Sequence, residues 1–178
     1  MTHTFEAAIG LDKYPIIIGV NIFRDLIAFL KTYSKKNIFI ICDKYFKTNN
    51  HFYSESLSFI FQYNHIFIDG GLESKTIGSY ENILKELVKK NIARDGVIVA
   101  IGGGVIGDLG AFAASTYQRG IDLVHIPTTT TAMIDSSVGG KTGLNHLEQV
   151  NLIGSYHNPK AIFMDLRFLV TLEDRDYY

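Results

Sequence analysis

Short apolar runs alternate with longer amphipathic stretches along this 178-residue chain, and this alternation limits the fold more than any other feature of the sequence. The runs that predict buried strands are 16–20, 37–42, 65–68, 97–101 and 123–126. Two stretches between them, 22–33 and 79–90, carry apolar residues at helical spacing. In the second stretch, Ile83, Leu84, Leu87 and Val88 are expected to share the buried face. The pattern predicts an α/β fold, in which helices cover both faces of a parallel sheet.

Composition and charge narrow the classes of protein to which the chain can belong. With 47% hydrophobic residues it can form one globular domain, which we expect to span 1–178. The 17 basic and 18 acidic residues give no excess of positive charge, so we expect no nucleic-acid partner. No apolar run approaches the ~18 residues of a membrane span, and no signal peptide is evident. We therefore expect a soluble, cytoplasmic protein without a membrane partner. The single cysteine, Cys42, is interpreted as a buried strand thiol.

The glycine-rich run 102–108 (GGGVIGD) directly follows the predicted strand 97–101. Glycines let a backbone approach a pyrophosphate closely, and the free N–H groups and dipole of a following helix favour its negative charge. A tight strand-to-helix turn is the alternative, but four glycines in six residues favour a phosphate site. The spacing differs from G-x-G-x-x-G and the run comes late in the chain, so it predicts a different kind of dinucleotide site.

Two further polar segments are candidates for ligand contact. Four threonines follow Pro127, and their hydroxyls could bind ribose or phosphate or could cap a helix. The segment 135–146 gathers carboxylate, hydroxyl, ammonium, amide and imidazole groups, which suits a pocket for a small polyol or sugar phosphate, although a surface loop is the alternative. Its Gly-Lys-Thr is not part of a P-loop, because Asp135 stands where that motif needs glycine. Arg119 could bind a phosphate or a carboxylate, or could simply be a surface residue.

The six histidines do not predict a metal site within this chain. They stand at positions 3, 51, 65, 125, 146 and 157, and no pair has the H-x-x-x-H or H-E-x-x-H spacing. His146 is the only one beside other candidate groups.

These motifs, in this order, resemble the 3-dehydroquinate synthase family of sugar phosphate cyclases. The resemblance runs from about residue 38 to the end and is carried by 102–108, 117–120, 127–129, 135–145 and 169–172. The segment 135–143 (DSSVGGKTG) is the most specific part. The resemblance implies a Rossmann-like NAD-binding domain of a homodimeric enzyme of the shikimate pathway. That enzyme would convert 3-deoxy-arabino-heptulosonate 7-phosphate into 3-dehydroquinate and phosphate, with NAD recycled. The family's zinc or cobalt would be held by a C-terminal helical domain that lies beyond this chain.

The resemblance also implies roles for individual residues. The positions it assigns to NAD are Asp43, Gly71, Lys75, Gly103, Gly104, Val105, Ile106, Gly107, Asp108, Thr128, Thr129, Lys141, Phe168, Leu169 and Thr171. The positions it assigns to substrate binding and catalysis are Asp135, Lys141, Asn151 and Arg119. Among these, Asp43 would lie near the adenine ribose, Lys141 would stand between nicotinamide and substrate, and Arg119 would reach the substrate of the partner subunit.

Three departures from the family pattern keep other functions open. Leu72 stands where the family has glutamate, Val150 replaces a substrate-facing lysine, and the family's chains are about twice as long. Val150 supports a different sugar phosphate cyclase as an alternative. A nucleotide-binding fragment without activity is the second alternative, and a relative of the iron-dependent alcohol dehydrogenases is the third.

Overall fold

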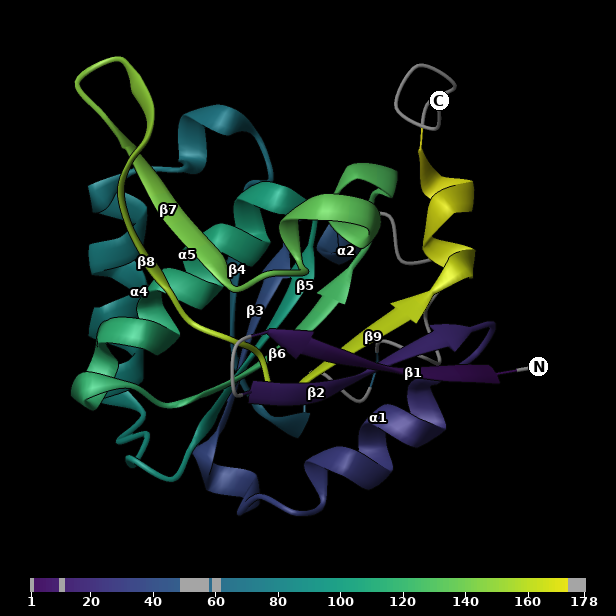
Figure 1. Ribbon diagram of the computed structural model, residues 1–178. Helices are drawn as coiled ribbons and strands as arrows, with labels where there is room; N and C mark the ends of the chain where they lie inside the picture. The colour runs from purple at the N-terminus through teal and green to yellow at the C-terminus, as the bar shows by residue number, and fades with distance from the viewer. Residues whose placement is uncertain (1, 10–11, 49–57, 59–61, 173–178) are drawn as a thin grey trace.

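The computed structural model describes residues 2–9, 12–48, 58 and 62–172, and most of its strands form one sheet. Within this part of the chain the sheet has seven strands in the order β1-β2-β9-β6-β5-β3-β4 (Figure 1). The strands are β1 (Thr2–Ile9), β2 (Asp12–Gly19), β3 (Ile38–Asp43), β4 (Asn64–Ile68), β5 (Val97–Gly102), β6 (Asp122–Pro127) and β9 (Ala161–Asp165). All neighbours pair in parallel except β1, which runs antiparallel to β2. The predicted parallel sheet is therefore confirmed, with one antiparallel strand added at its edge.

Helices cover both faces of this sheet, as the sequence predicted. They are α1 (Phe23–Leu30), α2 (Tyr45–Thr48), α4 (Ile77–Lys89) and α5 (Gly104–Thr116). Shorter turns are the 3₁₀ segments η1 (Lys35–Asn37), η4 (Leu72–Ser74), η5 (Tyr117–Arg119) and η7 (Leu166–Thr171), and the π-helical turn η6 (Ala132–Ser136). In Figure 1, α4 and α5 lie on one side of the sheet and α1 lies on the other.

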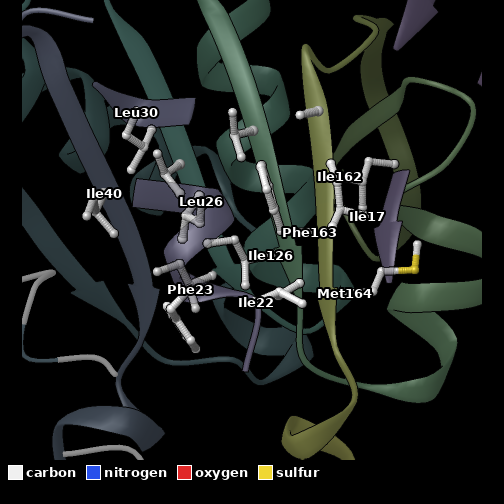
Figure 2. Close-up of a cluster of buried hydrophobic side chains, with 14 of the residues drawn as sticks. Ile17, Ile22, Phe23, Leu26, Leu30, Ile40, Ile126, Ile162, Phe163 and Met164 are labelled. Atoms are coloured by element: carbon white, nitrogen blue, oxygen red, sulfur yellow. The ribbon is translucent and has the colours of Figure 1, made fainter. Parts of the chain in front are cut away.

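Alternate residues of the central strands enter two separate hydrophobic clusters. In β3, Ile38 and Ile40 pack on the α1 side, and Phe39 and Ile41 pack on the side of α4 and α5. Figure 2 shows the first cluster, where Leu26 of α1 lies among side chains from several strands. Because both faces are buried, β3 and β5 appear in the sequence as continuous apolar runs. Cys42 is fully buried in β3, as predicted.

Two details of the sequence interpretation are wrong. Val88 does not belong to the buried face of α4, since its side chain is 63% exposed. Ile83 and Leu87 define that face, and the next residue is turned away by about 100° in an α-helix. The strand predicted at 16–20 begins earlier, at Asp12, and ends at Gly19, so Val20 lies outside it and is exposed.

An antiparallel hairpin, β7 (Lys141–His146) and β8 (Gln149–Tyr156), was not predicted. It lies along α5 (Figure 1), and Leu144 is buried in the cluster on that side of the sheet. Thus the polar segment 135–146 is not one loop: it starts in η6 and ends in β7.

Among the described residues, no helix is both long and apolar enough to cross a membrane.

Candidate functional site

The turn between β5 and α5 has the geometry expected of a phosphate-binding loop. The strand ends at Gly102 and the helix begins at Gly104, so a single residue separates them. The first N–H group bonded within the turn is that of Gly107, which donates to the carbonyl oxygen of Gly103 at 3.0 Å. The N–H groups before it lie at the positive end of the helix dipole, where an anion is favoured.

The glycines of this turn leave a cradle that side chains would fill. A Cβ atom on Gly103 would lie 3.2 Å from a methyl carbon of Thr129, and one on Gly104 would lie 3.1 Å from the hydroxyl oxygen of Ser136. A residue without a Cβ atom is therefore favoured at both positions, which leaves the backbone bare where the helix dipole favours an anion. Val105 and Ile106 point into the core, so any contact they make with such a ligand uses their backbone.

The threonines after β6 serve first as local structure. The Thr129 hydroxyl accepts a hydrogen bond from the N–H of Ala132 at 3.2 Å, which is a capping role. Thr128 is buried, and its N–H donates to the carbonyl of Gly102 at 3.0 Å. The cap interpretation therefore holds for Thr129, while its methyl group still borders the cradle.

Asp43 ends β3 on the same edge of the sheet as the glycine turn. Its carboxylate accepts a hydrogen bond from the N–H of Tyr45 at 2.9 Å, and burial raises the pKa of this carboxyl group. Gly70 lies against it, since a Cβ atom there would overlap an Asp43 carboxylate oxygen. The predicted Gly71 follows at once and leads into η4.

A buried ammonium group joins the loop after β4 to helix α5 and to the hairpin. Lys75 is only 4% exposed, and its Nζ donates to a carboxylate oxygen of Asp108 and to the side-chain oxygen of Asn151. Asp108 lies one turn into α5, slightly beyond the helix start where it was expected. Burial raises the pKa of the Asp108 carboxyl group, and the Lys75 ammonium opposes part of that rise. Asp108 and Asn151 stand 33 and 76 positions from Lys75 in the sequence, and the fold brings the three residues together.

A cleft of about 490 Å³ adjoins this group and contains three of the four predicted substrate residues. Its lining residues are Asp108, Asp135, Ser136, Lys141, Thr142, Asn151, Leu152, Gly154, Ser155 and Tyr156. For the first part of segment 135–146, this arrangement favours the pocket over the surface loop. The cleft has both polar and apolar walls and carries an ammonium group, two carboxylates and several hydroxyls, which suits a small phosphorylated polyol.

The residues of β8 are the part of the cleft that sequence reasoning missed. Ser155 lies on its wall and is fixed by Thr142 and Ser115, with hydroxyl-to-hydroxyl distances of 2.8 and 2.7 Å. Leu152 and Tyr156 are exposed on the same strand. The available signal was the polar–apolar alternation of residues 149–152 (QVNL), which is typical of a strand.

Other predicted residues lie away from this cleft. Arg119 is exposed at the end of η5, beside a second cleft at the amino ends of β2, β6 and β9. Phe168 is fully buried, with its ring centroid 6.1 Å from that of Phe23 and 5.3 Å from that of Phe46, so a cofactor contact there would use its backbone. Leu169 packs against the core, and the Thr171 hydroxyl donates to the Phe168 carbonyl at 2.6 Å.

The described residues contain no group of three or more histidine, cysteine or acidic side chains that could hold a metal ion.

The sequence of this chain is similar to those of known proteins. A family model described as 3-dehydroquinate synthase N-terminal matches residues 65–178. The 3-dehydroquinate synthase of Alkaliphilus oremlandii (strain OhILAs) is 46% identical over 177 residues, which cover 97% of this chain and 48% of that protein. The chain spans about half the length of the curated relatives it matches.

Two solved structures share the fold of this chain. A crystal structure of 2-deoxy-scyllo-inosose synthase matches with a TM-score of 0.82 at 26% identity, over 98% of this chain and 50% of that chain. The 2-epi-5-epi-valiolone synthase of Streptomyces hygroscopicus subsp. jinggangensis 5008, with NAD⁺ and Zn²⁺ bound, matches with a TM-score of 0.80 at 26% identity, over 96% of this chain and 48% of that chain.

Proposed function

Because this chain belongs to the 3-dehydroquinate synthase family, we propose that it is the NAD-binding half of an enzyme that converts 3-deoxy-arabino-heptulosonate 7-phosphate into 3-dehydroquinate and phosphate. One observation supports this most: the glycine cradle before α5 adjoins a polar cleft lined by Asp135, Lys141 and Asn151. A dinucleotide on the cradle and a sugar phosphate in the cleft would then be neighbours.

Each element of the site has a separate task in this proposal. The N–H groups at the start of α5 bind the diphosphate of NAD, and Asp43 accepts hydrogen bonds from the adenine ribose. When bound, NAD supplies the hydride acceptor. Lys141 offers a mobile positive charge to the substrate, and Asp135 and Asn151 orient its hydroxyl groups. Positioning two reactants in one cleft removes much of the entropic cost of bringing them together.

Two further components of the family's site are assigned outside the cleft. We propose that the metal ion is held by the part of the whole protein that this chain does not include. Arg119 does not line the cleft that contains Asp135 and Lys141. We therefore propose that it serves the cleft of a second copy of the chain in a homodimer.

The NAD assignment is tested with Gly104→Val. The valine side chain would lie beside Ser136 at the start of α5 and would keep a diphosphate group from approaching the backbone there. We expect the affinity for NAD, measured by titration calorimetry, to fall by at least about tenfold. Gly78→Val is the matched control, because Gly78 also lies in the first turn of a helix but has only an ordinary contact of 3.7 Å nearby. Equal affinity of the wild type and Gly104→Val for NAD would exclude the cradle as the binding site.

A second candidate function is a related cyclase that makes a different carbocycle. The supporting observation is Val150, which stands at the position of a substrate-facing lysine in the family pattern and is exposed next to Asn151. The two crystallised enzymes that share this fold are a 2-deoxy-scyllo-inosose synthase and a 2-epi-5-epi-valiolone synthase. The fold therefore accommodates more than one such enzyme. Identification of the carbocycle formed by the whole enzyme separates the two candidates.

A further inference from the structure

Asn151 has an uncommon backbone conformation at the rim of the cleft. Its φ angle is 56°, in the left-handed region that costs most residues about 1–2 kcal/mol and that asparagine tolerates better than most. Its N–H group donates to the side-chain oxygen of Asn145 at 3.0 Å. The Asn145 side chain therefore holds the Asn151 backbone in a conformation that places the Asn151 side chain beside Lys75.

The same three residues form a closed ring of hydrogen bonds. The N–H of Asn145 donates to the carbonyl of Lys75 at 2.8 Å, and the Lys75 ammonium donates to the Asn151 side chain. The bond from Asn151 to Asn145 closes the ring. Lys75 also pairs with Asp108 of α5, so the ring joins the loop after β4, the hairpin and the helix that follows the glycine cradle.

We infer that Asn145 is a positioning residue, which holds Asn151 and, through it, the Lys75 ammonium at the border between the NAD loop and the cleft. This inference rests on the proposed function, because Lys75 and Asp108 are assigned to NAD and Asn151 to the substrate. Asn145 itself does not line the cleft, so it acts through Asn151.

A purely structural role for Asn145 makes a different prediction. The hairpin has other anchors: Leu144 is buried against the core, and Thr142 bonds Ser155, which in turn bonds Ser115 of α5. These contacts do not involve Asn145 and should keep the hairpin on α5 after its substitution. Loss of Asn145 should thus alter the position of Asn151 and Lys75 more than it alters the stability of the fold.

The test uses this chain with the variants Asn145→Ala, Asn145→Asp, Asn151→Ala and the double alanine variant. Asn64→Ala is the matched control, since it removes one exposed asparagine bond, to the carbonyl of Lys36, at the opposite end of the sheet. We expect Asn145→Ala to weaken NAD binding about five- to tenfold, the effect of one preorganising hydrogen bond. Asn145→Asp keeps the acceptor oxygen and should bind NAD within about twofold of the wild type.

The double variant decides whether Asn145 acts through Asn151. If it does, the double variant binds NAD no more weakly than Asn151→Ala alone. Effects that multiply, or unchanged NAD binding in Asn145→Ala, would overturn the inference, as would a loss of binding that simply follows a loss of melting temperature.

Amide hydrogen exchange without NAD separates this inference from the proposed function. In Asn145→Ala we expect faster exchange at residues 145 and 151, with Ser155 unchanged, because Ser155 bonds the Thr142 hydroxyl at the other end of the hairpin. Unchanged protection of the residue 151 amide, whose bond to the Asn145 side chain the substitution removes, would overturn the inference. If the wild-type chain binds no NAD, the proposed function fails, and this exchange pattern alone decides whether Asn145 positions its neighbours.

Discussion

Val150 stands at a position where the resemblance to the family predicts a lysine. Its side chain is 69% exposed, and the next residue, Asn151, lines the cleft. An exposed site can accept a longer, charged side chain without disturbing the core, so its chemistry can vary with the ligand. Under the proposed function, we therefore expect Val150 to affect the binding of substrate more than the stability of the fold.

We expect Val150→Lys to strengthen binding of the heptulosonate phosphate in the presence of saturating NAD. One charge contact at ~4 Å is worth up to about 4 kcal/mol at an effective dielectric constant near 20, before desolvation. Desolvation and solvent screening should leave about 1–2 kcal/mol, or about ten- to thirtyfold in affinity by calorimetry. Val88→Lys, on the exposed face of α4, controls for a general effect of added charge. No gain would mean that another cation already compensates for Val150.

At the scale of elements, helix α5 is the piece on which the site is built. Its start forms the cradle, Asp108 holds Lys75, and β7 packs along its side. The buried His125 of β6 packs against α5 at Gly107, where a Cβ atom would lie 3.5 Å from its ring. Burial lowers the pKa of His125 from 6.5 to about 4, and the nearby His157 adds to this effect.

We expect the burial of His125 between β6 and α5 to make the protein less stable in mild acid. The folded state keeps His125 neutral, whereas the unfolded chain binds a proton near pH 6.5. The contribution of neutral His125 to the free energy of unfolding is therefore fully present above pH 6.5. It is lost as the pH falls to about 4, and the loss amounts to up to about 3 kcal/mol in all. The raised pKa values of Asp43 and Asp108 act with the opposite sign, because those groups bind protons more readily when folded.

His125→Leu isolates this contribution, since it removes the titrating group and leaves both carboxyl groups in place. Chemical unfolding at a series of pH values between 7 and 4 measures it. The wild type should lose more stability than the variant over this range. Parallel pH dependences for the two proteins would show that His125 is not responsible.

At the scale of the whole molecule, the chain corresponds to about half the length of its relatives. The cleft with Asp135 and Lys141 is formed within the described residues, so binding of ligands and turnover can be separated. Under the proposed function, binding of NAD needs only the glycine turn before α5, which this chain contains. Turnover would also need the proposed metal ion, which would lower the cost of deprotonating a substrate hydroxyl.

We accordingly expect this chain alone to bind NAD but to release no phosphate from the heptulosonate phosphate, even with zinc supplied. The measurement is a phosphate-release assay on the purified chain, with a heat-denatured sample as the baseline. Phosphate release above that baseline would contradict the division of labour proposed here.

The sequence by itself determined the features that depend on local chemistry. Continuous apolar runs identified β3 and β5, because a strand buried on both faces has no polar side. The glycines at 102–107 identified the tight turn before α5, because a Cβ atom at Gly103 or Gly104 would press against Thr129 or Ser136. The resemblance then selected Asp135, Lys141 and Asn151, which the structure brings into one cleft.

Only the tertiary structure decided the features that depend on contacts between distant segments. β1 is mostly exposed and the hairpin is covered on one side by α5, so neither has the apolar run that marked the central strands. The meeting of Lys75 with Asp108 and Asn151 joins residues that are 33 and 76 positions apart. No local preference encodes such a contact, because it exists only once α5 has packed on the sheet and the hairpin has packed on α5.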